Sequence, residues 1–140
     1  RGSHVKLSQL SQNAAAAETG RWVNHIPELG GLALKVRGLD NADYRRLSAH
    51  LAAEIPRADR ILGVAPEVTD AMQTRLIVET VLIDWRGLEH DDSTPVPYSR
   101  DMATKLLTDP NYRAFRAAVI WAAGVVGDDR LASDEADAKN

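Results

Sequence analysis

The chain has 140 residues, of which 44% are hydrophobic and 26% charged, a composition typical of one folded domain. Its net charge of −3 argues against a general nucleic-acid binder, since such proteins usually carry a basic stripe. The lack of cysteine excludes disulfides and thiolate metal sites, and no apolar run approaches the roughly 18 residues of a transmembrane helix.

The N-terminal end is expected to stay outside the fold. Residues 1–4, with the sequence RGSH, are typical of the remnant of an expression tag. Residues 5–20 are rich in Ser, Gln, Asn and Ala, and Leu7 and Leu10 are their large apolar residues after Val5. Such a composition favours a flexible segment over the alternative, a frayed helical turn. We expect the globular domain to cover residues 21–127.

A β-hairpin is predicted at the start of this domain. Residues 22–26 and residues 32–36 are short segments that are rich in apolar side chains, and Pro27, Gly30 and Gly31 lie between them. Two such segments around a glycine-bearing turn are typical of a hairpin.

Two helices are predicted in the middle of the chain. The first begins at Asp40 or Asn41, whose side chains can accept hydrogen bonds from free N–H groups of the first turn, and it ends at Pro56. The second runs from Pro66 to about residue 85. Its residues 76–83 are apolar on nearly all sides, which indicates a central helix and leaves a buried strand open as the alternative.

The last third of the chain is predicted to hold a loop and two more helices. Residues 86–98 are acidic and contain two prolines, as loops do. Ser99 can cap a helix that runs to about residue 107, and Asp109 with Pro110 can start another that ends at Gly127. Residues 128–140 are expected to be a disordered acidic tail. The predicted fold class is α+β and mainly α, with a small N-terminal β-hairpin, about four helices and disordered ends.

Few residues are candidates for catalysis or metal binding. The histidines at positions 25, 50 and 90 share no short spacing, and the sequence has no phosphate-binding glycine loop or nucleophile motif. The Glu-His-Asp-Asp run at 89–92 could hold Ca²⁺ or Mg²⁺ but lacks the calcium-loop spacing, so a solvated loop is preferred. Arg75, Arg113 and Arg116 could bind phosphate or pair with surface acids. We expect no enzyme activity, no metal and no cofactor.

Two apolar stripes lie on the predicted helix of residues 110–126. One is centred on Val119, and the other, about 140° away around the helix, contains Ala118, Trp121 and Val125. A small domain buries one stripe easily. The second stripe is therefore either covered by other elements of the same domain or is a surface for a partner or a second copy.

Trp85 and Tyr98 flank the acidic loop and are a second candidate surface. Tryptophan and tyrosine suit this role because they combine a large contact area with few rotatable bonds. The candidate partner-binding residues are Trp121, Val125, Ala118, Trp85 and Tyr98.

Four stretches in a fixed order carry a resemblance to a known family. They are GLDNADYRRL at 38–47, DWRGLE at 84–89, PVPYS at 95–99 and LLTDPNYRAFRAAV at 106–119. Over about residues 20–127 the chain resembles the small tail assembly chaperones of long-tailed phages and prophages. The resemblance implies a protein that binds the tape measure protein and keeps it soluble until tail-tube subunits assemble around it. It further implies the cytoplasm of the host bacterium as the location, the major tail (tube) protein as another partner, and neither nucleic acid nor membrane as a target.

Two other functions stay open at this stage. A tail completion or connector protein is also small and acidic and remains in the virion as a ring, formed by self-association. A small metal-dependent enzyme would use residues 89–92 as ligands. A homo-oligomer is compatible with the chaperone as well as with the ring.

Overall fold

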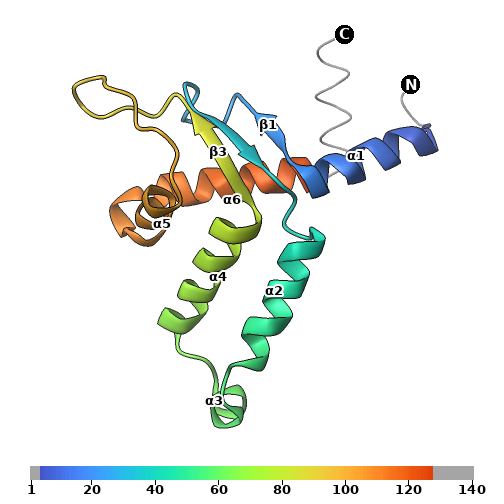
Figure 1. The fold of residues 1–140 in the computed structure, drawn as a ribbon, viewed down its shortest axis with the longest axis vertical. Coiled ribbons are helices and arrows are strands. Elements are labelled where there is room, and N and C mark those ends of the chain that lie inside the picture. Colours follow the sequence, from blue (N-terminus) through green and yellow to red (C-terminus); the bar gives the residue numbers. More distant parts are fainter. Residues whose placement is uncertain (1–3, 128–140) are drawn as a thin grey trace.

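A three-stranded antiparallel sheet forms the centre of the fold. The computed structural model describes residues 4–127 and contains strands β1 (Arg21–Val23), β2 (Ala33–Val36) and β3 (Leu82–Arg86), in the order β1-β2-β3 (Figure 1). Helices make up most of the rest, so the predicted mainly α class is confirmed. Residues 1–3 of the expected tag remnant and residues 128–140, the expected disordered acidic tail, lie outside the described residues.

The predicted hairpin is confirmed as β1 and β2. The two strands pair antiparallel, with Trp22 opposite Lys35 and Val23 opposite Leu34. Val23 and Leu34 are buried, whereas Trp22 and Lys35 are only half-buried, so alternate residues face the core. The other edge of β2 pairs with β3.

Strand β3 corrects the prediction of one helix to about residue 85. Helix α4 (Pro66–Thr80) ends at Thr80, and the chain turns through Val81 into β3. The apolar run of residues 76–83 thus spans the last turns of a buried helix and the start of a strand, which share the same local composition. The physical reason for the change is the free edge of β2, whose backbone N–H and C=O groups β3 satisfies.

Helix α6 (Arg113–Gly127) packs across the sheet. It contacts β1, β2 and α5 (Arg100–Thr108), and its buried Phe115 and Val119 join the sheet residues in one core. Figure 1 shows α6 crossing behind the strands, with α5 beside its N-terminal end.

The predicted starts of these two helices are confirmed by their caps. The Met102 N–H donates to Ser99 Oγ at 3.0 Å, which begins α5. The Asn111 N–H donates to the Asp109 carboxylate at 2.9 Å. This cap begins a short 3₁₀ turn, η1 (Pro110–Tyr112), which leads into α6.

Helices α2 (Ala42–Ala53) and α4 run side by side away from the sheet and are joined at their far ends by the short helix α3 (Arg57–Leu62) (Figure 1). We call these three helices the helical arm. Helix α3 is not predicted from the sequence. The base of the arm is held by Asn41, which is fully buried and, as predicted, caps α2 by accepting from the Tyr44 N–H at 2.8 Å.

Helix α1 (Leu7–Thr19) occupies the segment that the sequence predicts to be flexible. Its run of four alanines favours a helix, because alanine loses little side-chain entropy there. The C-terminal end of α1 is held by the domain, since the Gly38 N–H donates to the Ala17 carbonyl at 2.8 Å and α1 contacts α6. Residues 4–12 are exposed throughout, and Figure 1 shows this half of α1 pointing away from the sheet.

Gly87 is required where the acidic loop leaves β3. Its φ of +82° is in the left-handed region, and an added Cβ would lie 1.9 Å from the Gly31 carbonyl oxygen. Only glycine allows the two backbones to approach so closely. The loop of residues 87–98 therefore leaves the sheet directly beside the β1–β2 connection.

Arg37 links α1 to α2 and gives the fold a measurable pH dependence. Its Nη2 atom lies 2.9 Å from Asp43 Oδ2 and 3.6 Å from Glu18 Oε1. The hydrogen bond and the charge of Arg37 lower the pKa of Asp43 below its ordinary value of 3.8, and Arg46 acts in the same direction. Because the folded-state pKa is the lower one, this contribution to stability is present above pH 3.8 and is lost as the pH falls through the folded-state pKa.

We therefore expect Asp43→Asn to reduce the loss of thermal stability between neutral pH and about pH 3, since the variant has no carboxylate to protonate at this position. Melting temperatures at both pH values measure the effect. Asp70→Asn, at an exposed position on α4, is the matched control. Equal pH dependence of the two variants and the parent chain would contradict the assignment to Asp43.

Candidate interaction surface

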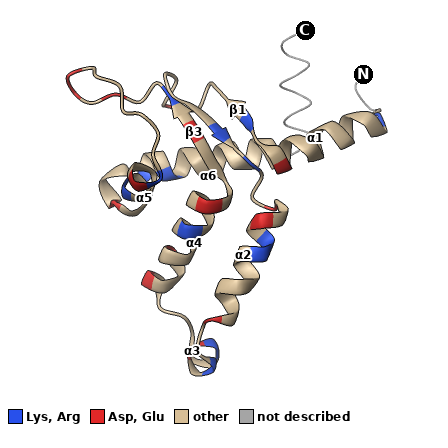
Figure 2. Ribbon diagram, in the orientation of Figure 1, with Lys and Arg blue, Asp and Glu red and all other residues tan. Residues whose placement is uncertain are grey.

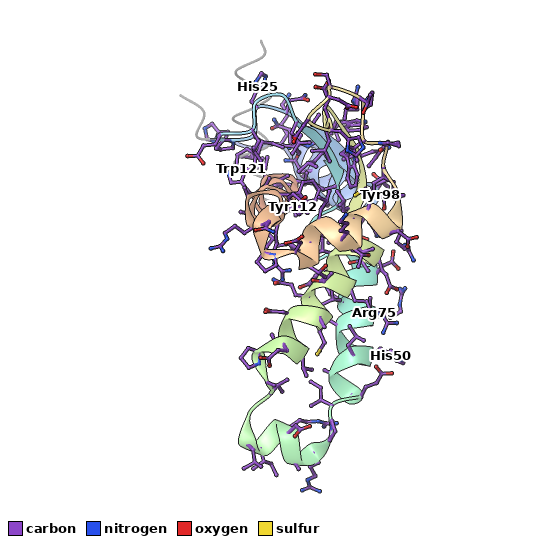
Figure 3. The ribbon with its side chains drawn as sticks, turned by 90° about the vertical axis from the view of Figure 1, so that its left-hand side faces the viewer. His25, His50, Arg75, Tyr98, Tyr112 and Trp121 are labelled. Atoms are coloured by element: carbon purple, nitrogen blue, oxygen red, sulfur yellow. The ribbon has the colours of Figure 1, made fainter. Side chains whose placement is uncertain are left out.

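Trp121 lies on the outward side of α6. It is 40% exposed, whereas Phe115 and Val119 on the same helix are buried against the sheet. Figure 3 shows Trp121 on the same side of the molecule as His25 and on the opposite side from Tyr98. The large apolar side chain of Trp121 is thus available to a partner.

A hollow of about 370 Å³ adjoins Trp121. One wall is α6 and the other is the loop between β1 and β2. Most of the lining is apolar, and Glu28 is its charged residue. We call this surface the Trp121 patch, and it consists of Ile26, Pro27, Glu28, Leu29, Ala114, Ala117, Ala118 and Trp121.

The loop wall of the Trp121 patch is fixed by its own contacts. The Leu29 N–H donates to the Ile26 carbonyl and the Leu32 N–H donates to the Leu29 carbonyl, both at 3.0 Å. Ile26 is buried and anchors the loop in the core. The loop also contains two non-glycine residues with positive φ, His25 at 56° and Glu28 at 68°. A loop held in this way presents a preformed surface, so a partner would not have to order it on binding.

Two of the predicted partner-binding residues on α6 are buried. Ala118 is 5% exposed and Val125 is 7% exposed, because α6 is covered by β1, β2, α1 and α5. The stripe of Ala118, Trp121 and Val125 is therefore largely covered by other elements of the same domain, which is the first of the two alternatives that the sequence leaves open. Trp121 is the member of the stripe that remains exposed.

Trp85 is part of the core in this structure and does not present a free face. It is 4% exposed, and its ring makes edge contacts with Tyr98 at 5.0 Å and with Phe115 at 5.6 Å between centroids. Its Nε1–H donates to the Val96 carbonyl at 2.8 Å. Tyr98 is half-buried, and this burial raises the pKa of its hydroxyl. The pair that the sequence proposes as partner anchors thus holds the acidic loop to the sheet.

The acidic loop is closed by one of its own carboxylates. The Thr94 N–H and hydroxyl donate to Asp92 Oδ1 at 3.0 Å and 2.6 Å, and these hydrogen bonds lower the pKa of Asp92. The His90 N–H donates to the Thr94 carbonyl at 2.8 Å. Asp92 therefore has a structural role in the turn. Within residues 4–127, no group of three or more His, Asp or Glu side chains is arranged to hold a metal ion.

The three candidate phosphate-binding arginines do not form one cluster. Arg75 pairs with Glu79 one turn along α4, at 2.6 Å. Arg113 donates to a backbone carbonyl of η1. Arg116 reaches from α6 to α4, where its Nη1–H donates to Thr74 Oγ1 at 3.1 Å. Arg75 thus pairs within its own helix, whereas Arg116 joins α6 to α4.

A second apolar surface, which is not predicted from the sequence, lies at the tip of the helical arm. Ile61 and Leu62 on α3 are 74% and 85% exposed. Beside them is a cavity of about 350 Å³, which we call the tip groove. The sequence signal for this surface is the apolar pair Ile61 and Leu62 between Pro56 and Gly63, and two residues are too few to show a helical periodicity. The lining of the groove includes Leu51, Ile55, Val64, Val68 and Met72, together with Glu54 and Asp59.

Charge is spread unevenly over these elements. Figure 2 shows acidic and basic residues on the helical arm and acidic residues on the long loop, while α6 is almost without charge beyond its first turns. The uncharged outer side of α6 is where Trp121 lies. Within the described part of the chain, no helix is long and apolar enough to cross a membrane.

Comparison with known proteins gives a family for most of the chain. Residues 39–140 match the family described as YdaY prophage protein. This range includes the helical arm, β3, the acidic loop, α5 and α6, and it excludes α1 and the β1–β2 hairpin. Neither the curated proteins nor the solved structures gave a match. The chain thus belongs to the YdaY prophage protein family.

Proposed function

We propose that the chain is a prophage tail assembly chaperone that binds the tape measure protein and keeps it soluble while the tail is built. Membership of a prophage protein family supports a role encoded with phage genes. The finer assignment is supported by the four stretches that resemble tail assembly chaperones, three of which lie wholly inside the matched range.

The observation that carries this proposal is the exposure of Trp121 beside a preformed apolar hollow. A chaperone for a long helical client needs an apolar surface that the client's apolar side chains can cover. Trp121 offers a large area on a rigid helix, and buried tryptophans are among the side chains that contribute most to binding. The matching client segment is an amphipathic helix that inserts an apolar side chain into the hollow.

The charge of the Trp121 patch indicates which client helices it prefers. Glu28 is the charged residue of the Trp121 patch, and the chain as a whole carries a net charge of −3. An acidic residue beside an apolar hollow favours a client helix with lysine or arginine next to its apolar face. On this proposal the chain needs no catalytic residue, metal or cofactor, and it works in the cytoplasm of the host bacterium. The major tail protein is a second partner on the same proposal.

Co-expression with the tape measure protein encoded in the same prophage tests the function. We expect the tape measure protein to be soluble and to co-purify with the chain, and to be insoluble when expressed alone. A tape measure protein that stays insoluble and unbound would contradict the chaperone function. If the chain were found instead in purified tails, the tail completion protein would be the better assignment.

A further inference from the structure

The first half of α1 carries an apolar face that no other part of the described chain buries. Leu7 is 84% exposed and Leu10 is 40% exposed, and residues 4–12 are exposed throughout. Residues three apart lie on the same side of a helix, so the two leucines form one face. Helical turns without tertiary packing are marginally stable in water, so docking of this face would stabilise the start of α1.

The tip groove has the complementary chemistry. Its lining is mostly apolar, and the charged side chains in it, Glu54 and Asp59, are both acidic, with Glu54 Oε2 lying 3.4 Å from His50 Nε2. Lys6 immediately precedes Leu7 and is also exposed. Helix α3 holds two basic residues, Arg57 and Arg60, and Arg60 is turned onto the end of α2, where its Nε–H donates to the Ile55 carbonyl at 2.9 Å. The start of α1 therefore combines two leucines with a positive charge, which suits a mostly apolar groove whose lining holds two carboxylates.

The groove is large enough for this face. A cavity of about 150 Å³ lined by apolar side chains holds a benzene-sized group. The tip groove measures about 350 Å³, which leaves room for two leucine side chains. Val68, which lines the groove, is 46% exposed and would be covered.

The two surfaces lie at different ends of one molecule. Figure 1 shows α1 projecting beside the sheet and α3 at the far end of the helical arm. The start of α1 therefore does not reach the tip groove of its own chain. We propose that the start of α1 in one copy docks in the tip groove of a second copy, with Leu7 and Leu10 in the groove and Lys6 beside Glu54 and Asp59.

The contact joins two different surfaces, so it is head-to-tail. After the first contact the pair still has one free α1 and one free tip groove, and further copies add in the same way. Such contacts give closed rings if the rotation closes and open chains if it does not. The inference therefore predicts assemblies larger than a dimer as the concentration rises.

Light scattering on size-exclusion fractions of the full chain tests this contact. We expect the parent chain to form assemblies, and we expect both Leu7→Ser/Leu10→Ser and Val68→Lys to be monomeric. The matched control is Tyr112→Ser, which also removes an exposed large side chain but lies at neither surface. Circular dichroism confirms that each variant is folded.

Mixing the two defective variants gives the sharpest result. The α1 variant keeps an intact groove, and the groove variant keeps an intact α1, so one contact can form between them. We expect a 1:1 pair with twice the mass of the chain and nothing larger. If the mixture stays monomeric while the parent chain assembles, another surface joins the copies and the inference is wrong.

Reversing the charges of Lys6, Glu54 and Asp59 tests the proposed ion pairs separately from the apolar contact. We expect Lys6→Glu alone and Glu54→Lys/Asp59→Lys alone each to weaken assembly, and the chain with all three changes to assemble again. A parent chain that is monomeric at every concentration would also overturn the inference. The proposed chaperone function depends on the Trp121 patch, so client binding measured with the monomeric variants shows separately whether that proposal fails.

Discussion

Replacing Trp85 by alanine is expected to lower the free energy of unfolding by about 3–5 kcal/mol, the range for removing a large aromatic side chain from a core. The ring is 4% exposed and lies between Tyr98 and Phe115, so its loss leaves a cavity between the acidic loop, β3 and α6. The Val96 carbonyl would also lose the hydrogen bond from the indole N–H.

Denaturant unfolding followed by circular dichroism measures this change. Trp121→Ala is the matched control, because it removes the same side chain from an exposed position and is expected to cost less than about 1 kcal/mol. A small loss of stability in Trp85→Ala would show that this tryptophan is not a core residue, and it would restore the sequence-based prediction that it binds a partner.

Asn41→Leu is expected to destabilise the fold by about 2–4 kcal/mol. The side chain caps α2 through the Tyr44 N–H, and the loss of such a cap costs about 1 kcal/mol. Asn41 Nδ2–H also donates to the Gly38 carbonyl at 2.7 Å and to the Thr80 carbonyl at 2.8 Å. A buried carbonyl left without its donor costs about 1–3 kcal/mol more.

The effect should be visible in the helical arm first, since Asn41 joins the start of α2 to the end of α4. Hydrogen exchange of α2 and α4 amides reports this locally, and denaturant unfolding reports the total. Asn111→Leu is the control, because Asn111 is exposed and contributes only its backbone N–H to the cap of η1. Equal stability of the two variants would rule out the network around Asn41.

The parts of the fold that were predicted correctly have local signals. Asn41, Ser99 and Asp109 are capping residues at the positions where α2, α5 and η1 begin. The hairpin was predicted because its two apolar segments surround a proline and two glycines. Each of these features depends on residues that are close together in the sequence.

The missed features depend on contacts between distant segments. Residues 82–86 form a strand because the edge of β2 is free to pair with them, and no local pattern separates that strand from the buried helix before it. Helix α1 was missed because the four alanines that favour it stand among Ser, Gln and Asn, and because the Gly38 N–H that holds its C-terminal end comes from the distant connection between β2 and α2.

Only part of the candidate site could be predicted from the sequence, because the rest also depends on contacts between distant segments. A helical wheel identifies the stripe on α6, but burial of Ala118 and Val125 depends on the elements that cover them. Trp85 and Tyr98 are expected from the sequence to face a partner, but they pack against each other, and Trp85 also packs against Phe115 of α6. The tip groove is formed by three helices, and no single one of them carries its signal.

The central claim is that the chain binds its client through the Trp121 patch, and Trp121→Ala tests it most directly. Binding to the co-expressed tape measure protein and the melting temperature are measured on the same preparations, with Tyr112→Ala as the exposed aromatic control. We expect client binding to weaken tenfold or more, as at binding hot spots, while the melting temperature stays within a few degrees. A large fall in melting temperature with client binding intact would contradict the claim and assign Trp121 to the core.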